Sequence, residues 1–225
     1  MSTKKPLNQD AVVAASKPTA AKSSPRRKSA SLGPRHEDKR IAILRTAAQL
    51  FAEKGYEATS LDMIAEVLGM HKATLYHYMS SKESILYQCL VFSFSDLEVI
   101  MEKMHDRSVP VLDRLRSFIR SLAQAQNNDF GRCLILVGSR PLDMLPGGEI
   151  RQFQRRLDTV VRDLVTEGMA DGSIRPLHVG LFSAMLFGAL NWIPRWHKDS
   201  GKLSVQEVVD SFMDMMLYGV ATPKR

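Results

Sequence analysis

Cysteines are scarce and long apolar runs are missing from this 225-residue sequence. The two cysteines, Cys89 and Cys133, each lie within apolar sequence, so two reduced core thiols are a simpler interpretation than a disulfide framework. No apolar run approaches the roughly 20 residues that a transmembrane helix requires. We therefore exclude secreted, disulfide-stapled proteins and membrane-spanning proteins.

Residues 1–35 lack aromatic side chains and contain a single acidic residue, Asp10, beside eight basic ones. Their net charge of +7 equals the formal net charge of the whole chain, so the rest of the sequence balances to zero. A stretch this poor in apolar residues cannot offset the entropy lost on ordering, and we predict a disordered basic arm over residues 1–36. The arm either adds sequence-independent contacts to DNA phosphates or is a solubilising tail without a partner.

Apolar residues recur at helical spacing from Glu37 onward, which predicts a first helix with one buried face. Gly55 supplies the left-handed residue that ends this helix, and Tyr56 can fold back on its last turn. The buried face consists of Ile41, Leu44, Ala48 and Phe51.

Two capping boxes predict where further helices begin. Thr59 with Asp62 predicts the start of a second helix. Ser80 with Glu83 predicts the start of a longer one that reaches about His105. Between these two helices the chain has room for one short helix.

This short helix, over residues 72–78, follows a tight turn at Gly69 and Met70. Two short helices joined by a tight glycine turn are the geometry of a helix-turn-helix, whose second helix lies in the major groove of DNA. Apart from the core residue Leu75, the second helix consists of short or polar groups and tyrosines, which suit base edges and phosphates. The composition therefore favours DNA binding over an ordinary helical hairpin.

The segment from Arg40 to Leu90 resembles the TetR family of transcriptional regulators. The matching residues are Phe51, Gly55-Tyr56, Thr59-Ser60, Ile64-Ala65, Gly69, Leu75-Tyr76-His77-Tyr78 and Ser81-Lys82-Glu83. The resemblance implies a DNA-binding domain over residues 37–97, with its helix-turn-helix at 60–79. It also implies that DNA phosphates are held by Thr59, Tyr76 and Lys82. The groove would be faced by Lys72, Ala73, Thr74 and His77, and Ser60 completes the expected DNA contacts.

Two positions depart from the family pattern. His71 stands where the family usually has a serine or threonine that caps the recognition helix, and a neutral imidazole caps less well. Met79 replaces the usual phenylalanine, a change that a flexible thioether can accommodate. Tyr76 could alternatively pack on the first helix. We expect no metal site, because His71 and His77 have no third ligand nearby.

Helical periodicity continues through residues 98–225, which we expect to form an effector-binding and dimerisation domain. The expected helices are 110–127, 131–139, 150–169, 177–196 and a last one capped by Ser204 with Glu207. The predicted fold class is therefore all-α. It consists of an N-terminal three-helix helix-turn-helix DNA-binding domain and a helical C-terminal ligand-binding and dimerisation domain.

The helix over residues 177–196 is apolar on nearly every side, so it must be covered on every side. Together with the last helix it offers more apolar surface than a monomer needs, which predicts an isologous two-fold interface; a thick monomer core is the alternative. The family resemblance implies the same pairing, as a four-helix bundle. The expected interface residues are Leu186, Leu190, Val209, Phe212, Met213 and Met216.

Methionines and phenylalanines on inward faces suit an adaptable apolar pocket, with an ordinary core position as the alternative for each. The candidates are Phe94, Met101, Met104, Phe118, Met144, Phe153, Met185 and Trp192. The run over residues 187–204 resembles the C-terminal domain of TetR members that answer to acyl-CoA thioesters in fatty-acid and sterol breakdown. We expect Pro194 within this run to end or kink the helix.

Catalytic signatures are missing from the sequence, which has no glycine-rich phosphate loop after a strand, no metal-binding His-Glu pair and no nucleophile beside a base. We therefore expect no enzyme activity, no cofactor and no membrane partner. We expect a sequence-specific transcriptional regulator of the bacterial cytoplasm. In this hypothesis it is a homodimeric repressor, released from a near-palindromic double-stranded DNA operator by an acyl-CoA or other small apolar effector. The alternative is a constitutive nucleoid-type protein whose basic arm supplies most of the DNA affinity.

Overall fold

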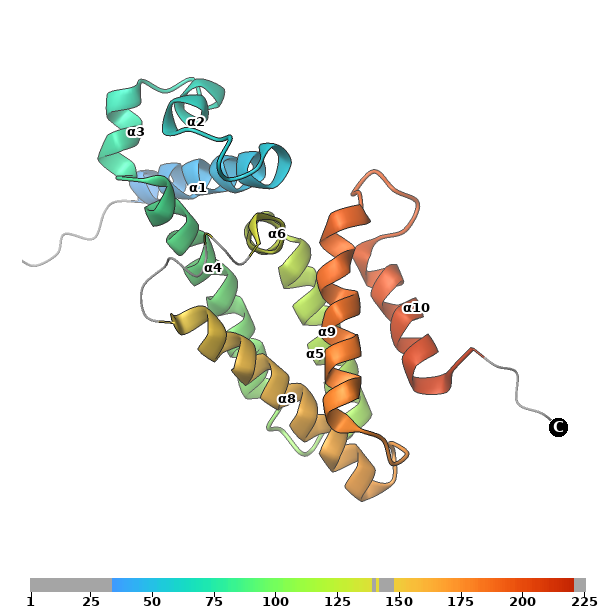
Figure 1. The fold of residues 1–225 in the computed structure, drawn as a ribbon. Helices are drawn as coiled ribbons and strands as arrows, with labels where there is room; N and C mark the ends of the chain where they lie inside the picture. The colour runs from blue at the N-terminus through green and yellow to red at the C-terminus, as the bar shows by residue number, and fades with distance from the viewer. Residues whose placement is uncertain (1–33, 139–140, 142–147, 221–225) are drawn as a thin grey trace, which may run out of the picture. The chain divides into compact units, whose positions relative to one another are not determined.

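In the computed structural model, residues 34–138, 141 and 148–220 are described, and within them nine α-helices have defined bounds and no strand occurs (Figure 1). The first helices are α1 (Pro34–Lys54), α2 (Leu61–Val67), α3 (Lys72–Tyr78) and α4 (Lys82–Lys103). Those that follow are α5 (Val111–Asn127), α6 (Asp129–Val137), α8 (Glu149–Asp171), α9 (Val179–Trp196) and α10 (Val205–Tyr218). The all-α prediction is confirmed, whereas residues 1–33 of the expected arm lie outside the described residues.

Helix α1 begins at Pro34, three residues before the predicted start at Glu37. Proline suits the first helical position, because the amide hydrogen that it lacks would have no partner there. Gly55 ends the helix with a φ of 91°, and its N–H donates to the carbonyl of Phe51 at 3.1 Å. The ring of Tyr56 returns to 5.0 Å from that of Phe51, as predicted.

Ser60, and not the predicted Thr59, caps α2, because the Ser60 Oγ accepts a hydrogen bond from the Met63 N–H at 3.1 Å. Thr59 turns inward instead and is 1% exposed. Its hydroxyl donates to the Gly55 carbonyl at 2.9 Å, with the Leu50 carbonyl 3.3 Å away. The Thr59 hydroxyl therefore stabilises the loop between α1 and α2 and does not cap the first turn of α2.

The same shift by one residue occurs at the start of α4. Ser81, and not the predicted Ser80, accepts a hydrogen bond from the Ser84 N–H at 3.1 Å. The helix ends at Lys103, slightly before the expected His105. Both cap corrections have one cause. Each site offers two adjacent hydroxyl residues, and the second of them has the extended backbone of an N-cap and lies directly before the helix.

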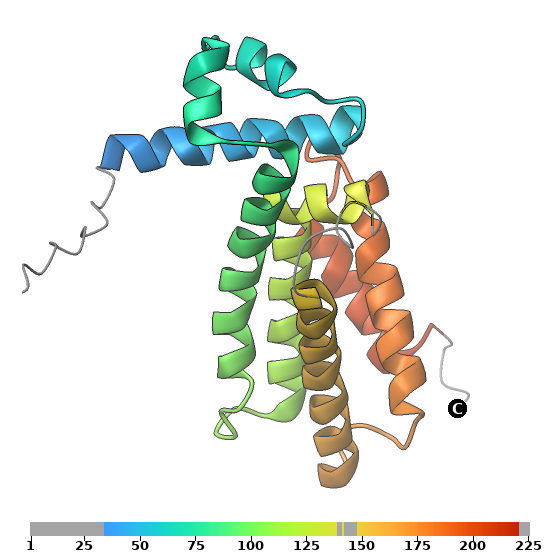
Figure 2. The same cartoon turned by 60° about the vertical axis from the view of Figure 1, so that its left-hand side comes forward.

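The helices pack around two apolar cores. The first core joins α1, α2, α3 and the start of α4, and it includes Cys133 from α6. The second joins α4, α5, α8, α9 and α10. Figures 1 and 2 show α1 crossing the upper end of α4, and α6 packs against α1, α4 and α5. Helix α4 therefore belongs to both cores, and α6 is a second element that joins the helices of the second core to the first.

Helix α4 is the one described helix that is long and apolar enough, by length and composition, to cross a membrane. Seven of its residues are buried, and the helix packs against α1, α5, α6 and α8. Helices in the core of a folded domain can have the same length and apolar composition. The apolar character of α4 is explained by this packing within the chain.

Helix α9 continues through Pro194 and ends at Trp196, so this proline does not end the helix. Pro194 lies in the last turn, where its missing N–H removes a single hydrogen bond. The N–H of His197 still donates to the carbonyl of Ile193 at 2.9 Å, so the turn closes normally.

The start of α10 is the capping box that the sequence predicts. The Ser204 Oγ accepts from the Glu207 N–H at 3.2 Å, and the Glu207 carboxylate accepts from the Ser204 N–H at 2.7 Å. These hydrogen bonds, first from the Ser204 backbone and then from its hydroxyl, lower the pKa of Glu207.

Candidate DNA-binding helix and ligand cavity

Helix α3 is anchored by few residues and exposes the others. Leu75 is fully buried, as is Met79 directly after the helix, so the thioether packs in the core as predicted. The residues expected to face the groove are all exposed, namely Lys72, Ala73, Thr74 and His77. One side of α3 is therefore accessible to DNA while Leu75 fixes the other to the core.

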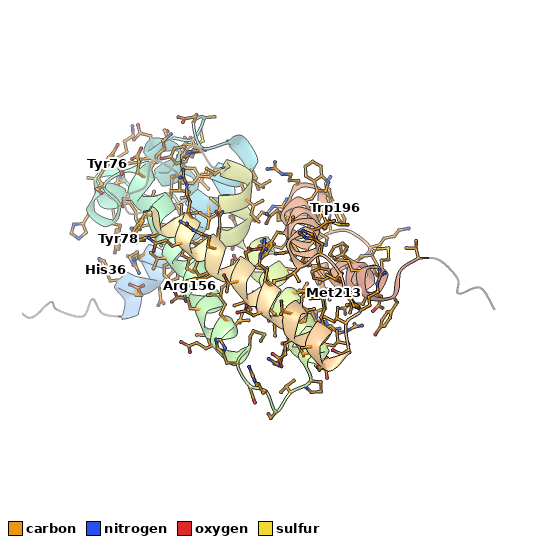
Figure 3. The ribbon with its side chains drawn as sticks, turned by 60° about the horizontal axis from the view of Figure 1, so that its bottom comes forward. His36, Tyr76, Tyr78, Arg156, Trp196 and Met213 are labelled. Atoms are coloured by element: carbon orange, nitrogen blue, oxygen red, sulfur yellow. The ribbon has the colours of Figure 1, made fainter. Side chains whose placement is uncertain are left out.

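Tyr76 is 52% exposed, so the alternative in which it packs on α1 does not hold. The tyrosine of α3 that contacts α1 is Tyr78, whose ring stacks on that of His36 with centroids 4.4 Å apart. Figure 3 shows His36 close to Tyr78 and Tyr76 farther away. The phenol of Tyr76 is thus accessible, as a phosphate contact requires.

The first turn of α3 is held by an ion pair rather than by a side-chain cap. The Lys72 Nζ lies 2.5 Å from the Asp62 Oδ2 of α2, and this hydrogen bond raises the pKa of Lys72. His71, at the N-cap, makes no side-chain hydrogen bond to the helix, as predicted. Asp62 therefore orients the lysine at the start of α3.

Lys82 is half-buried against the loop that follows α1. Its Nζ donates to the Tyr56 carbonyl at 2.9 Å and lies 4.5 Å from the centre of the Tyr56 ring. The Tyr56 hydroxyl lies 3.3 Å from the Glu83 Oε1, and burial, followed by the charge of Glu83, raises the pKa of Tyr56 to about 12. The pKa of Glu83 is lowered, mainly by a hydrogen bond from its own backbone N–H. Lys82 thus has a structural partner besides any phosphate.

Thr59 does not offer its side chain to a phosphate, because it is buried and its hydroxyl is bonded within the chain. This corrects the contact implied by the family resemblance. Ser60 is exposed at the start of α2 and is the accessible member of the pair.

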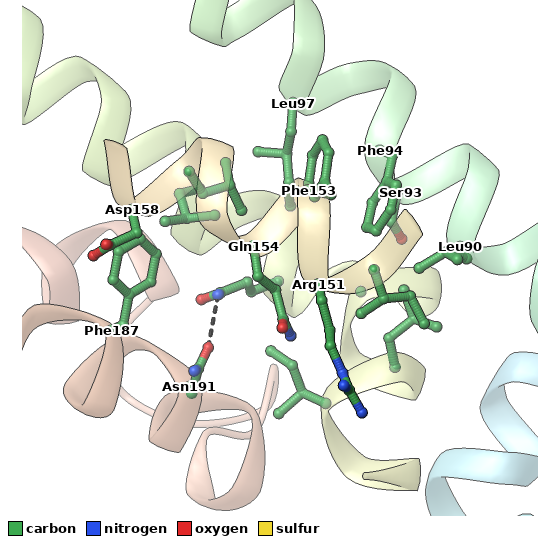
Figure 4. A pocket seen from close by; sticks show the side chains of 18 of the residues that line it. Leu90, Ser93, Phe94, Leu97, Arg151, Phe153, Gln154, Asp158, Phe187 and Asn191 are labelled. Carbon is green, nitrogen blue, oxygen red and sulfur yellow. Dashed lines mark hydrogen bonds between the residues drawn. The ribbon is translucent and has the colours of Figure 1, made fainter. Parts of the chain in front are cut away.

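A cavity of about 900 Å³ lies between α4, α5, α6, α8 and α9 (Figure 4). Its apolar wall centres on Phe94 and Phe153, whose stacked rings have centroids 3.6 Å apart. Leu97, Leu122 and Leu157 extend this wall. A volume of this size is typical of sites that enclose small organic ligands.

Polar side chains line the rest of the cavity. The amide nitrogen of Gln126 on α5 donates to the Asn191 Oδ1 on α9 at 2.8 Å. Arg151 lies apart from the phenylalanine pair in Figure 4, and Arg195 lines the cavity from α9. The cavity thus combines an apolar region with amide and guanidinium groups.

The cavity includes some of the expected pocket residues and leaves out others. Those that line it are Phe94, Phe153 and Trp192. Those that are buried in the core instead are Met101, Met104 and Phe118. Met185 is 60% exposed and does not line the cavity, and Met144 lies outside the described residues. Long apolar side chains suit a core and a pocket equally well, so their chemistry alone could not separate the two groups.

The polar part of the lining is a feature that our sequence analysis missed. Ser93 lies four residues after Cys89 and four before Leu97, in the middle of the buried face of α4. Asn191 similarly interrupts the apolar sequence of α9. A small polar residue within an apolar helix face is the sequence signal that indicates such a polar cavity wall.

The outward faces of α9 and α10 differ from the interface that the sequence predicted. Four of the expected residues are buried in the chain's own core, namely Leu186, Leu190, Val209 and Met213. Phe212 and Met216 are half-buried. The apolar residues that are exposed instead are Leu181, Met185, Trp192 and Trp196 on α9, with Met215 and Tyr218 on α10. A groove of about 800 Å³ lies between these two helices.

Helix α6 lines the cavity and also belongs to the first core. Leu134 and Ile135 line the cavity, whereas Cys133 is buried in the first core with Cys89 of α4. A hydrogen bond with Cys133, together with burial, raises the pKa of the Cys89 thiol. Both side chains are fully buried and pack in the first core.

The start of α6 is bound to α1 and pressed against α5. The Asp129 carboxylate lies 3.0 Å from the Arg45 Nε and accepts from the Gln49 amide at 3.1 Å, both on α1. At Gly131 a methyl group would overlap the carbonyl oxygen of Ala125, so no side chain separates α5 from α6. Helices α5 and α6 are therefore in close backbone contact, and α6 is bonded directly to α1 through Asp129.

An exposed helix on a compact three-helix core, followed by helices that enclose a ligand-sized cavity, defines a helix-turn-helix DNA-binding protein with a helical companion domain. Among the described residues, no group of three or more metal-binding side chains gathers at one place. Residues 43–89 match the family described as bacterial regulatory proteins, tetR family. Residues 108–220 match the tetracyclin repressor-like C-terminal domain. The chain belongs to the TetR family of transcriptional regulators.

Similar proteins include a named repressor, a second regulator and a structure solved with ligand and DNA. The HTH-type transcriptional repressor KstR2 of Mycolicibacterium smegmatis is 29% identical over 188 residues, which cover 81% of this chain and 90% of KstR2. The TetR family regulator PfmR of Thermus thermophilus is 30% identical with a TM-score of 0.69, over 80% of this chain and 99% of that chain. The structure of AibR in complex with isovaleryl coenzyme A and operator DNA is 25% identical with a TM-score of 0.65, over 80% and 98% of the two chains.

Proposed function

We propose that this chain is a homodimeric repressor that leaves its operator when an acyl-CoA or another small apolar molecule occupies the cavity. The observation that carries the proposal is the position of α6, which lines the cavity and packs in the helix-turn-helix core. A ligand that displaces α6 can shift α1 and α4, which share the first core with Leu75 of α3. In this division residues 37–97 bind DNA, residues 98–225 bind the effector and the second subunit, and residues 1–36 add phosphate contacts.

The lining of the cavity supports an acyl-CoA as the effector. The stacked rings of Phe94 and Phe153 offer an apolar surface for an acyl group. Arg151 and Arg195 offer guanidinium groups, which bind phosphates well. AibR, which shares the fold, has been solved with isovaleryl coenzyme A and operator DNA.

The exposed side of α3 supports reading of a near-palindromic operator. In our proposal Lys72, Thr74 and His77 meet base edges, while Tyr76 and Lys82 meet phosphates. A dimer sets its two recognition helices roughly 34–36 Å apart, one turn of DNA. An effector that changes this separation weakens both half-sites together, with a coupling of about 1–3 kcal/mol.

The exposed apolar stripe of α9 supports the homodimer. Leu181, Met185, Trp192 and Trp196 follow one another at spacings of four, seven and four residues, so they share one face of the helix. Contiguous exposed apolar surface of this kind marks an interaction site. A two-fold pairing of α9 and α10 would cover it with the same surface of a second subunit.

Fluorescence anisotropy tests the proposal with labelled DNA from upstream of the protein's own gene and random-sequence competitor DNA. We expect the full chain to prefer the upstream DNA, and isovaleryl-CoA or octanoyl-CoA to release it, whereas free coenzyme A does not. Protein truncated to residues 34–225 should keep the preference and lose only a salt-sensitive part of the affinity.

The basic arm supports a second candidate, a constitutive nucleoid-type protein. Its eight basic residues could supply sequence-independent affinity without any effector. In that case the truncated protein would barely bind, no DNA would be preferred and no acyl-CoA would release it. This set of results would contradict the proposal that the chain is an effector-controlled repressor.

A further inference from the structure

Ser93 is a buried polar residue in the wall of the cavity. It is 5% exposed and lies on α4 directly before Phe94, and both side chains line the cavity. Its hydroxyl has no hydrogen-bond partner among the described residues. A serine within a helix can bond a carbonyl of the preceding turn, as Ser95 does to the Phe92 carbonyl at 3.0 Å. Ser93 differs from Ser95 in facing the cavity instead.

A second unpaired atom lines the same cavity. The amide nitrogen of Gln126 is bonded to Asn191, but its amide oxygen is buried and has no partner among the described residues. Figure 4 shows Ser93 beside Leu90 and Phe94, with Asn191 on the opposite side of the cavity. The cavity therefore has unpaired hydrogen-bonding groups on two sides of an otherwise apolar region.

Buried polar groups without a partner are costly, and a plain hydrocarbon chain would leave both of these unpaired. A ligand that carries oxygen at the matching place would pair them and gain affinity over one of equal size that does not. The geometry of the cavity thus favours one chemical class of acyl group over another.

We propose that the effector is an acyl-CoA whose carbon skeleton carries a hydroxyl or keto group, and that Ser93 selects it by a hydrogen bond to that oxygen. The Gln126–Asn191 pair offers the second polar contact on the opposite wall. This inference rests on the proposed function, because it names the class of acyl group that the repressor answers to.

Isothermal titration calorimetry tests this with octanoyl-CoA and its 3-hydroxy, 5-hydroxy and 7-hydroxy derivatives, which place the oxygen at three depths. We expect the wild type to bind at least one hydroxylated derivative about ten times more tightly than octanoyl-CoA. Ser93→Ala should abolish that preference and leave octanoyl-CoA affinity within about two-fold. Ser95→Ala, the same change outside the cavity on the same helix, should keep it.

The melting temperature of the ligand-free protein provides a second readout. Because the Ser93 hydroxyl has no partner, Ser93→Ala should melt no lower than the wild type. A clearly lower melting temperature, or a preference that survives in Ser93→Ala, would overturn the role of Ser93. Equal affinity of the wild type for octanoyl-CoA and all three derivatives would overturn the proposed selection of oxygenated acyl groups. It would leave the proposal of an acyl-CoA effector standing. Failure of the wild type to bind any acyl-CoA would overturn the proposed effector class as well.

Discussion

At the scale of single residues, α3 separates anchoring from DNA contact. Leu75 is fully buried, whereas Thr74 and Tyr76 on either side of it are exposed. Burial of a leucine side chain contributes about 1.5–3 kcal/mol, while an exposed residue without special contacts contributes within about 0.5 kcal/mol. A change at an exposed position of α3 can therefore alter DNA affinity without altering stability.

Replacing Tyr76 by alanine should weaken binding to operator and random DNA alike, because a phosphate contact does not depend on sequence. We expect the free energy of unfolding to change by less than about 0.5 kcal/mol. Anisotropy on both DNAs and urea denaturation measure these two effects. A Tyr76→Ala protein that binds random DNA as well as the wild type would remove Tyr76 from the phosphate contacts.

The matched control for this prediction is Thr59→Val. Valine keeps the shape of the side chain but leaves the Gly55 and Leu50 carbonyls without its hydroxyl. Stability should therefore fall by about 1–3 kcal/mol, with the DNA affinity of the folded protein unchanged.

At the scale of helices, α6 is short but has neighbours on several sides. It packs against α1, α4 and α5, and Asn128 alone separates it from α5. Asp129 then holds its first turn to Arg45 and Gln49 of α1. In the proposed switch, a displacement of the cavity wall reaches the helix-turn-helix through this contact.

Asp129→Asn should uncouple effector binding from DNA release. The amide keeps the size of the side chain but loses the charge that Arg45 binds. We expect DNA affinity without effector to stay within about two-fold, and the drop caused by a saturating acyl-CoA to shrink by about three-fold or more. Glu98→Gln is the control, because its ion pair with Arg156 joins α4 to α8 without touching α1. An effector response unchanged in Asp129→Asn and equal to that of Glu98→Gln would contradict this route.

Helix bounds were predictable from the sequence because caps and glycines are local signals. Gly55 ends α1 and Ser204 with Glu207 begins α10 as predicted. The capping-box pattern favoured Thr59, because an acidic residue, Asp62, follows it at the third position and Met63 follows Ser60, yet Ser60 is the cap. The choice depends on carbonyls that only the folded loop brings to Thr59.

At the scale of the whole molecule, the sequence predicted the helices of both domains. It did not predict which faces of these helices are buried by other helices. Helix α9 is apolar on nearly all sides, so its periodicity could not tell the buried Leu186 from its exposed neighbour Met185. Phe94 and Met101 lie seven residues apart on α4, yet one lines the cavity and the other is core. Packing by helices distant in sequence decides both cases.

The exposed stripe of α9 gives a prediction for the assembly. Met185→Glu should place charges in the centre of the proposed two-fold interface, producing monomers and weakening operator binding by at least about ten-fold, because half-sites would be bound singly. Light scattering after size-exclusion chromatography measures the mass. Val99→Glu, at an equally exposed apolar position on α4, should leave the mass and affinity unchanged. A Met185→Glu protein that remains dimeric would contradict this interface.

The sparse anchoring of α3 has a consequence for the evolution of the protein. Because Leu75 supplies the deep packing of this helix, its exposed positions can accumulate substitutions at little cost to folding. Selection on mutations at Ala73 or Thr74 would then act through the regulated genes and hardly at all through stability. A duplicated copy of such a gene could acquire a new set of targets by drift on one short helix, while its cavity stayed unchanged.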